Sequence, residues 1–279
     1  MTNPHNTFGK GHSTRAINGG LDAYFTAPDV ATACIETLAP LLKRWKLGNA
    51  LFIEPAAGSG VWLDALPANA LAAAYDIAPQ DPRVQQADFL TLTVPANSIV
   101  IGNPPFGFAA KDAIRFFNHA ATGAAVIAFI VPRTFKKASV QARLHTNYHL
   151  EVCEDLPAYS FRVNGVPHDV PCCFQIWKRK AKKRSISLVS MDNPWLEFTT
   201  PGRADFAVRR VGGRAGQVLE GLDHSLSSTY FIRAKINPRE LQLLIRRIDF
   251  AAINHTAGVR SLSKRELISA INDAMAEAA

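Results

Sequence analysis

Residues 98–107 read Ser-Ile-Val-Ile-Gly-Asn-Pro-Pro-Phe-Gly. The β-branched run from Ile99 to Ile101 predicts a short buried strand, and the two prolines after Asn103 predict its end, because proline cannot pair within a central strand. Consecutive prolines also stiffen an extended backbone, so the Asn103 amide is held on a rigid loop. The Asn103 oxygen and a proline carbonyl can each accept one N–H of an amino group, while the Phe106 ring covers a planar molecule. The stretch therefore predicts a site for a planar substrate with an exocyclic amino group.

A second turn, Glu54-Pro-Ala-Ala-Gly-Ser-Gly60, lies between a predicted strand at 49–53 and a helix predicted to begin near Val61. Ligands bind at such strand-to-helix turns in open α/β sheets, and glycines let a ligand approach the backbone closely. The turn has neither the Gly-x-Gly-x-x-Gly pattern of dinucleotide sites nor the Lys-Ser/Thr of phosphate loops. Its opening carboxylate suits a cationic amino-acid group better than a pyrophosphate.

Acidic residues follow the next two elements. Asp76 ends a predicted strand at 71–75, a position from which a carboxylate can hold a ribose diol. Asp88 and Phe89 come one element later, where the carboxylate can accept an amino hydrogen of adenine and the phenyl ring can pack on the purine. Each of these residues alone is also typical of an ordinary turn or helix cap, so the interpretation depends on their order along the chain.

Strands and helices alternate through the first part of the chain, which predicts a doubly wound α/β sheet. The last two strands of this part follow one another without a helix and predict a closing antiparallel hairpin. Thr26 is expected to cap the first helix. Further strands are predicted at 97–102, 125–131, 151–156 and 171–177, and helices at 28–46 and near 110–120 and 136–148. Beyond a charged boundary at 178–184, residues 186–233 are rich in β-like segments, and 238–249 and 263–275 predict helices.

The composition is that of an ordinary globular protein, with 279 residues, 48% hydrophobic and 19% charged. No apolar run reaches membrane-spanning length and the N-terminus lacks the features of a signal peptide, so we expect a cytoplasmic protein with no membrane partner. A monomer is expected by default. The four cysteines lack metal-ligand spacing, so no metal site is expected. Cys172 and Cys173 stand in an apolar run and are predicted to be buried strand thiols.

Over residues 22–177 the chain resembles amino-methyltransferases that use S-adenosylmethionine (SAM). The resemblance rests on Asn103-Pro104-Pro105-Phe106, the Glu-Pro-x-x-Gly-x-Gly turn, Asp76 and Asp88-Phe89, which stand in the order of that family. Phe25-Thr26-Ala27-Pro28 precedes the Gly-rich turn, which is similar to the gamma class of adenine-N6 DNA methyltransferases. Ala27 stands where that class often has proline, and Thr26 stays in register. The fold implied is the Rossmann-like sheet of SAM-dependent methyltransferases.

The resemblance implies a role for each matching residue. SAM would be the cofactor, with its methionine part near Phe25, Thr26, Glu54, Ala56, Gly58 and Gly60, its ribose and adenine near Asp76 and Ile77, and its adenine near Asp88 and Phe89. The catalytic tetrapeptide would hold the target amino group through the Asn103 oxygen and the Pro104 carbonyl, with Pro105 stiffening the loop and Phe106 stacking on the base. Two acceptors favour the pyramidal nitrogen that the reaction needs, because the amino lone pair is otherwise delocalised into the ring.

Positive charge is concentrated in the last third of the chain. Residues 1–177 contain 13 Lys/Arg and 13 Asp/Glu, whereas 178–279 contain 18 and 10. This asymmetry favours a polyanion-binding module, the alternative being a solvated basic surface. We therefore expect a flexible polar arm at 1–20, a SAM-dependent methyltransferase domain at 21–180 and a small basic α+β nucleic-acid-recognition domain at 185–279.

The substrate expected from this reading is adenine in DNA, methylated at N6. A base inside a duplex would have to be flipped out, and aromatic stacking would offset part of the cost. Phe161 is the expected second aromatic wall, with Tyr159 as the alternative residue and core packing as the alternative role of Phe161. The expected contacts to phosphates or bases are Arg203, Arg209, Arg210 and Arg214, on a Gly-rich, β-like segment.

Other functions use the same residues. An RNA adenine-N6 methyltransferase would need the same chemistry, and the small last domain keeps that alternative open. Methylation of the N4 amino group of cytosine would use the same two hydrogen-bond acceptors. A catalytically inactive nucleic-acid-binding subunit would not need Asn103, Glu54 or Asp76. Protein glutamine methylation also uses an Asn-Pro-Pro-Tyr tetrapeptide, but the basic last third argues against it.

Overall fold

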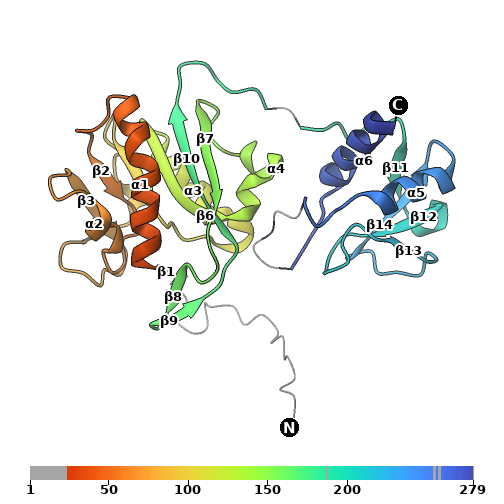
Figure 1. The fold of residues 1–279 in the computed structure, drawn as a ribbon, viewed down its shortest axis with the longest axis horizontal. Coiled ribbons are helices and arrows are strands. Elements are labelled where there is room, and N and C mark those ends of the chain that lie inside the picture. The colour runs from red at the N-terminus through yellow and green to blue at the C-terminus, as the bar shows by residue number, and fades with distance from the viewer. Residues whose placement is uncertain (1–23, 187, 254–255, 257–258, 279) are drawn as a thin grey trace, which may run out of the picture. The chain divides into compact units, whose positions relative to one another are not determined.

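The computed structural model describes residues 24–186, 188–253, 256 and 259–278 (Figure 1). These residues form two compact units. The first contains the described residues up to Val131 together with Tyr148–Lys180, and the second contains Pro132–Asn147 together with the described residues from Ala181 onward. The polar arm expected at 1–20 lies outside the described residues.

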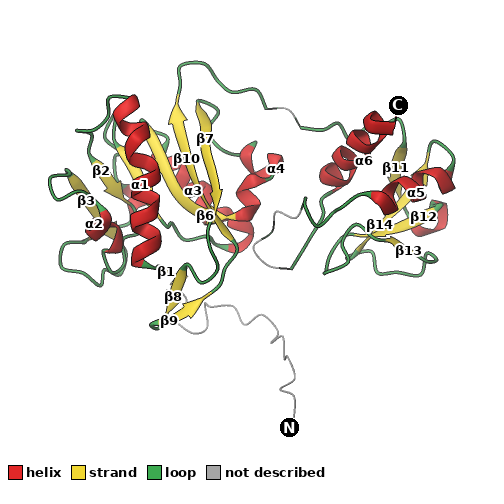
Figure 2. Ribbon diagram, in the orientation of Figure 1, coloured by secondary structure: helices red, strands yellow, loops and turns green. Residues whose placement is uncertain are grey.

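A seven-stranded sheet organises the first unit (Figures 1 and 2). Its strands are adjacent in the order β4-β3-β2-β5-β6-β10-β7. The strands from β4 to β6 pair in parallel, and β10 pairs with β7 in antiparallel register. The bounds are β2 (Phe52–Glu54), β3 (Ala72–Asp76), β4 (Gln85–Gln86), β5 (Ile99–Gly102), β6 (Val126–Pro132), β7 (Tyr148–Asp155) and β10 (Cys172–Arg179).

The chain leaves β2 toward β3 and β4 on one side and returns to β5 and β6 on the other side. The strand order therefore switches direction between β2 and β5, which is where open α/β sheets bind their ligands. Glu54 ends β2, and Asn103 directly follows β5. The doubly wound sheet with its antiparallel closing pair confirms the Rossmann-like arrangement expected of SAM-dependent methyltransferases.

Both faces of the central strands are buried, because helices lie on each side. Helix α1 (Pro28–Arg44) packs on alternate residues of the sheet, such as Ile99 and Ile101. The intervening residue Val100 is also fully buried, and Phe117 of α3 (Lys111–Ala120) meets Trp177 of β10 edge to face at 5.4 Å. The short helices of this unit are α2 (Val61–Ala65) and the 3₁₀ turns η2 (Phe89–Thr91) and η3 (Phe108–Ala110).

A three-stranded sheet lies beside the main one, in the connection between β7 and β10. The sequence predicts no further strand there, whereas the structure has β8 (Phe161–Val163) and β9 (Val166–His168). Strand β8 pairs antiparallel with β1 (Phe25–Thr26). This pairing ties the segment before α1 to the hairpin and fixes Phe25 and Thr26 at the sheet's edge.

Two local predictions were wrong. The helix expected near 136–148 is only η4 (Arg133–Lys136) and α4 (Ala138–Gln141), and β7 begins at Tyr148. Arg184 Nη2 donates to the carbonyl oxygens of Gln141 and Leu144, which stabilises these carbonyls outside a continuing helix. Thr26 does not cap α1, because it pairs in β1 and the cap position is Ala27.

Residues 132–147 group with the second unit, although they fall inside the expected methyltransferase domain. Lys137 Nζ lies 3.2 Å from Glu266 Oε2 and donates to the carbonyl oxygen of Ser261. Both side chains of this ion pair are largely buried, with 11% and 15% of their surfaces exposed. The segment is therefore held by an ion pair to helix α6 (Lys264–Ala278).

The second unit is a small α+β fold (Figure 2). Its antiparallel sheet has the order β11-β14-β12-β13, and α5 and α6 complete its core. The helices predicted at 238–249 and 263–275 are confirmed. The bounds are β11 (Leu196–Thr199), η5 (Pro201–Arg203), β12 (Phe206–Arg209), β13 (Val218–Leu219), β14 (Thr229–Ala234), α5 (Pro238–Arg247) and α6 (Lys264–Ala278).

Gly102 generates a testable prediction, because it joins β5 to the tetrapeptide with φ +147°. A Cβ at this position would lie 3.3 Å from Glu54 Cγ and 3.5 Å from Pro55 Cδ. We expect Gly102→Ala to lower the free energy of unfolding by about 1–3 kcal/mol, measured by urea denaturation. Gly48→Ala is the control, since no atom lies within 4 Å of its added Cβ. Equal midpoints for the two variants would contradict this account of Gly102.

Candidate active site

A cavity opens at the carboxyl ends of β2, β3 and β5, within the first unit. Every residue expected to bind cofactor lines it except Gly60, and Asn103 and Pro105 line it from the tetrapeptide. The structure therefore places the Gly-rich turn, both acidic positions and two residues of the tetrapeptide around one space, while Pro104 and Phe106 do not line it. The sequence reasoning did not single out Tyr24, Pro55, Ala57, Ser59, Val61, Trp62, Ala78, Gln80 or Phe116, which also line the cavity.

The Gly-rich turn is fixed by the residue at the end of the neighbouring strand. Asp76 Oδ2 accepts a hydrogen bond from Gly58 N and Asp76 Oδ1 accepts one from Ala78 N, each at 2.8 Å. Gly58 has φ +49°, and a Cβ there would lie 2.9 Å from the Phe25 ring. Glycine is therefore required on both conformational and steric grounds at this position.

Gly60 is the exception because it performs a different task. It precedes α2 with φ +75°, and a Cβ there would lie 2.9 Å from Asp81 Oδ2. Arg83 pairs with Asp81 and with Asp64 of α2, at 2.7 Å in each case. Gly60 thus lets the loop after β3 approach the start of α2, behind the cavity wall.

Glu54 is the electrostatic centre of the cavity. Only 3% of its surface is exposed, and burial, followed by the nearby charges of Asp76 and Asp64, raises the pKa of its carboxyl well above the usual range. The pocket thus disfavours an isolated negative charge at Glu54. A cation bound there would reverse this effect, because an opposite charge stabilises the ionised carboxylate.

Three buried side-chain oxygens on the cavity wall have no hydrogen-bond partner among the described residues. They are Thr26 Oγ1, Glu54 Oε2 and Asn103 Oδ1. Leaving a buried polar group unpaired costs about 1–3 kcal/mol. Three such atoms from three separate segments of the chain indicate a site built to receive hydrogen-bond donors from a ligand.

The Asn103 amide is oriented by the backbone of Tyr24. Its Nδ2 donates to the carbonyl oxygen of Tyr24 at 2.8 Å, which leaves Oδ1 as the atom available for a donor. The same segment continues into β1, which the hairpin holds in place. An interaction between residues far apart in sequence thus sets the direction of the tetrapeptide's acceptor.

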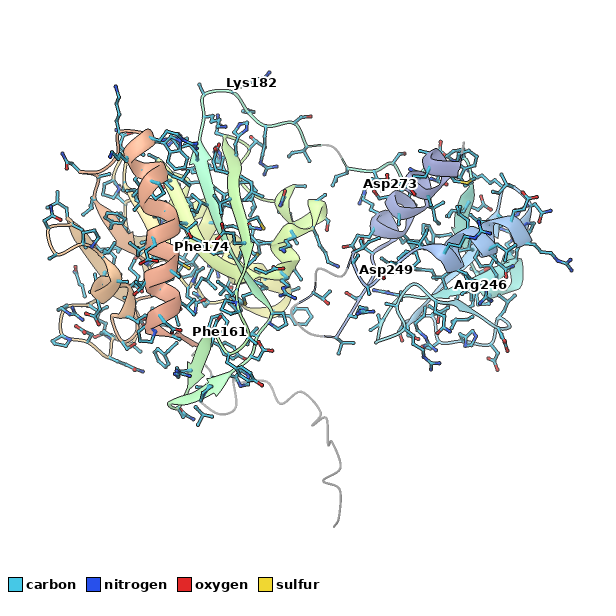
Figure 3. All side chains as sticks on the ribbon, viewed as in Figure 1. Phe161, Phe174, Lys182, Arg246, Asp249 and Asp273 are labelled. Carbon is cyan, nitrogen blue, oxygen red and sulfur yellow. The ribbon has the colours of Figure 1, made fainter. Side chains whose placement is uncertain are left out.

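Four aromatic rings cluster next to Asn103. Tyr24 and Phe106 are nearly parallel, with centroids 6.4 Å apart and an 18° angle between the planes. His168 stacks on Tyr24 at 5.4 Å, and Phe161 meets both Tyr24 and Phe106 edge to face. Phe161, which Figure 3 labels, has no exposed surface and is part of the hydrophobic core. Tyr159 is 62% exposed at the start of the hairpin and does not line the cavity.

The other expected cofactor contacts differ in exposure. Ile77 is 53% exposed at the rim, while Phe89 is 2% exposed and stacks on Phe116 at 5.6 Å. Asp88 caps η2, since its Oδ1 accepts from Leu90 N at 2.9 Å. The capping role considered from the sequence is thus present, and the residue still lines the cavity.

An exposed aromatic residue follows the tetrapeptide directly. Phe108 has 93% of its surface exposed, and Gly107, Ala109 and Ala110 around it all have positive φ. Left-handed backbone at two consecutive alanines is unusual. Phe108 could have been noticed in the sequence, because it is a second Phe two positions after Phe106, but it was not considered there.

The four arginines expected to contact nucleic acid lie in the second unit and have different surroundings. The Arg210 guanidinium covers the Tyr230 ring at 5.3 Å, and Arg203 is exposed on η5. Arg209 and Arg214 line a separate open cavity of this unit. These three environments could not be distinguished in the sequence, because all four arginines stand in the same Gly-rich segment.

Cysteines and metal sites take no part in the cavity. Cys172 and Cys173 are fully buried in β10, as predicted. Among the described residues, no group of three His, Cys, Asp or Glu side chains could hold a metal ion. No helix in the described part of the chain combines the length and apolar character needed to cross a membrane.

Comparisons with known proteins give structural neighbours only. No protein-family model matches the sequence, and no curated protein matches it. One similar solved structure is an RNA methyltransferase candidate, PH1948 from Pyrococcus horikoshii, with 14% identity over 57% of this chain and 87% of that chain and a TM-score of 0.46. Another is magnesium protoporphyrin IX methyltransferase from Synechocystis PCC 6803 with bound SAM, with 12% identity over 54% and 79% and a TM-score of 0.40. The strand order of the first unit carries the fold assignment on its own.

Glu54 generates a prediction about stability and pH. The folded pKa of Glu54 lies above its unfolded value of about 4.3, so the folded state holds the proton more tightly. Its contribution to stability is complete below pH ~4 and is lost as pH rises through the folded pKa. We expect Glu54→Gln to gain stability relative to the wild type between pH 5 and 8, measured by thermal unfolding. Glu36→Gln, on the exposed face of α1, is the control and should show no such trend.

Proposed function

We propose that the chain is a SAM-dependent methyltransferase that acts on the N6 amino group of adenine in DNA. The observation that carries the proposal is the convergence of Glu54 Oε2, Thr26 Oγ1 and Asn103 Oδ1, all buried without partners, on one cavity. That cavity lies at the switch point of a sheet with the methyltransferase strand order.

The residues around the Gly-rich turn fit SAM. Glu54 would accept the α-ammonium group, whose positive charge compensates the buried carboxylate. Thr26 Oγ1 offers an additional acceptor beside it, and Asp76 and Asp88 stand at successive positions toward the rim. Bound SAM supplies a methyl group already activated by the positive sulfur. The protein is then required mainly to position the two reactants.

The tetrapeptide fits an amino acceptor. Asn103 Oδ1 would take one N–H of the target amino group and the Pro104 carbonyl would take the other. The hydrogen bond to Tyr24 O keeps the Asn103 oxygen toward the cavity, so little reorientation is needed when the substrate arrives. The target ring would rest on Phe106, with Tyr24 in place of Phe161 as the second aromatic wall.

A nucleic-acid substrate is preferred because the excess positive charge lies in residues 178–279, most of which belong to the second unit. DNA is preferred over RNA because Phe25-Thr26-Ala27-Pro28 precedes the Gly-rich turn, as in the gamma class of adenine-N6 DNA methyltransferases. Base stacking of about 1–3 kcal/mol per base offsets part of the cost of flipping the base. The same site would accept adenine in RNA, and a catalytically inactive binding subunit would keep the fold without transfer. These two readings are distinct outcomes of one experiment.

The test is transfer of tritium from labelled SAM to unmethylated duplex DNA, total RNA and a protein extract, followed by digestion and chromatography. N6-methyldeoxyadenosine as the labelled product would support the proposal. N6-methyladenosine from RNA would keep the chemistry and replace the substrate. Bound SAM without transfer to any of the three would contradict the assignment as an active enzyme.

Asn103 generates the catalytic prediction. Asn103→Ala should lower the transfer rate by at least about 100-fold, as losing a positioned hydrogen-bonding group does in other enzymes. The dissociation constant of SAM, measured by calorimetry, should change little. Asn49→Ala, on an exposed turn before β2, is the matched control and should retain full activity. Unchanged turnover in Asn103→Ala would contradict the role of the tetrapeptide.

Tyr24 generates a prediction that separates its ring from its backbone carbonyl. Tyr24→Ala keeps the carbonyl that orients Asn103 but removes the ring, so KM for nucleic acid should rise about 5- to 150-fold, equivalent to ~1–3 kcal/mol of stacking. Tyr24→Phe should behave like the wild type. Phe161→Leu is the comparison for a core residue. It should lower the unfolding temperature and leave KM for nucleic acid close to the wild-type value. A KM unaffected by Tyr24→Ala would place the base elsewhere.

A further inference from the structure

An open cavity of about 390 Å³ lies in the second unit, between the β12–β13 turn, the loop after β13 and the end of α5. Arg209 at the end of β12, Arg214 in the turn and Arg246 in the last turn of α5 line it, together with His224. Figure 3 labels Arg246 on α5. The sequence patterns singled out the first two arginines but gave no reason to join Arg246 or His224 to them.

The charges around this cavity are unbalanced. Three arginines line it, and Glu220 is the single acidic residue of the lining. Among the described residues, none of the three arginines has an ion-pair partner, whereas Arg83 and Arg233 elsewhere do. Like charges gathered around a partly enclosed space repel one another, and a bound anion removes that cost.

Backbone and side-chain hydrogen bonds hold the cavity walls in place. Arg209 N donates to Gln217 O at 2.9 Å, and Gly216 N donates to Arg209 O at 2.7 Å, so the turn that carries Arg214 is tied to β12. Arg209 Nη1 also donates to Ser228 Oγ at 3.2 Å. Two of the arginines therefore belong to one fixed piece of backbone, which reduces the entropy lost when they bind a ligand.

Another contact fixes the opposite wall. His224 Nε2 donates to the carbonyl oxygen of Glu220 at 2.9 Å, so the imidazole is set by the turn after β13. Arg246 is exposed at the end of α5, and Ile245 beside it is buried in the core of the unit. Three parts of the fold therefore position the cations of the cavity: the hydrogen bonds of Arg209, the turn that carries Arg214, and the packed helix α5 that carries Arg246.

We propose that this cavity binds a phosphate group of the nucleic-acid backbone. Guanidinium groups match phosphate oxygens through paired hydrogen bonds, and backbone phosphates set the register of a protein on its nucleic acid. The inference rests on the proposed function for its choice of a phosphodiester over a free phosphate. In this assignment Arg209, Arg214 and Arg246 contact the phosphate together. Arg210 has a different role, because its guanidinium lies over the Tyr230 ring.

The test compares two neighbouring arginines of α5 in the full-length protein. Arg246 lines the cavity and Arg247 does not, and both are exposed, so Arg246→Ala and Arg247→Ala make the same change in net charge. Affinity for duplex DNA and for RNA is measured by fluorescence anisotropy at several salt concentrations. We expect Arg246→Ala to weaken binding about 5- to 10-fold and to reduce the salt slope by about 1, as loss of one phosphate contact does. Arg247→Ala should weaken binding less than twofold.

Glu220→Gln gives a change in the opposite direction. It removes the only carboxylate of the cavity, so nucleic-acid affinity should rise about 2- to 5-fold. Equal losses for Arg246→Ala and Arg247→Ala would show that only the general positive field matters and would overturn the proposal. No gain for Glu220→Gln would show that the bound anion does not lie in this cavity and would overturn it as well. Unfolding temperatures of the variants should match the wild type, since all three side chains are exposed.

Failure of this proposal and failure of the proposed function have different signatures. Methyl transfer and SAM binding are measured separately from anisotropy, so a protein without transfer can still support the phosphate site. A thermal-shift titration with inorganic phosphate and with pyrophosphate identifies a site for free phosphate. A shift there that Arg246→Ala abolishes, without any binding of DNA or RNA, would overturn the assignment to a nucleic-acid backbone.

Discussion

The hydrogen bond from Asn103 Nδ2 to Tyr24 O is the constraint on which the arrangement of the site depends. An amide has one acceptor atom, and using its NH₂ group on the protein turns that acceptor toward the ligand. The bond requires the segment before α1 to lie against the end of β5. Pairing of β1 with β8 holds it there, so the hairpin between β7 and β10 helps to fix the tetrapeptide although it lies far from it in sequence.

Glu54 shows why this part of the sheet is costly to maintain. Its carboxyl is buried beside Asp76, which itself holds the Gly-rich turn through Gly58 N. The two acidic groups therefore have different roles: Asp76 fixes the backbone of the turn, and Glu54 contributes a buried carboxyl to the cavity wall. Burial of apolar residues in β5 and β6 stabilises the fold and offsets the cost of the buried Glu54 carboxyl. A cationic ligand that relieves the strain would bind with part of that energy.

Sequence patterns predicted the fold well and the site partly. Apolar runs such as Ile99–Ile101 and strand-to-helix turns at glycines are local signals, so the sheet and the cavity wall followed from them. Tyr24 and Phe161 could not be told apart locally, because both are aromatic residues beside short strands. Only the pairing of β1 with β8 buries Phe161 and leaves Tyr24 at the cavity. Thr26 was misplaced as a helix cap for the same reason.

The basic domain illustrates the same limit for charge. Net charge indicates the class of partner, but the role of each arginine depends on what its guanidinium contacts in the fold. Arg209 and Arg210 are adjacent in sequence, and successive side chains along an extended strand point to opposite sides of the sheet. Arg209 lines the arginine-lined cavity, and the Arg210 guanidinium covers the Tyr230 ring. Arg246 joins the first of them from a helix far along the chain, which no local pattern indicates. The arginine-lined cavity is thus assembled by the sheet together with α5, and charge counting alone can only locate the domain that carries it.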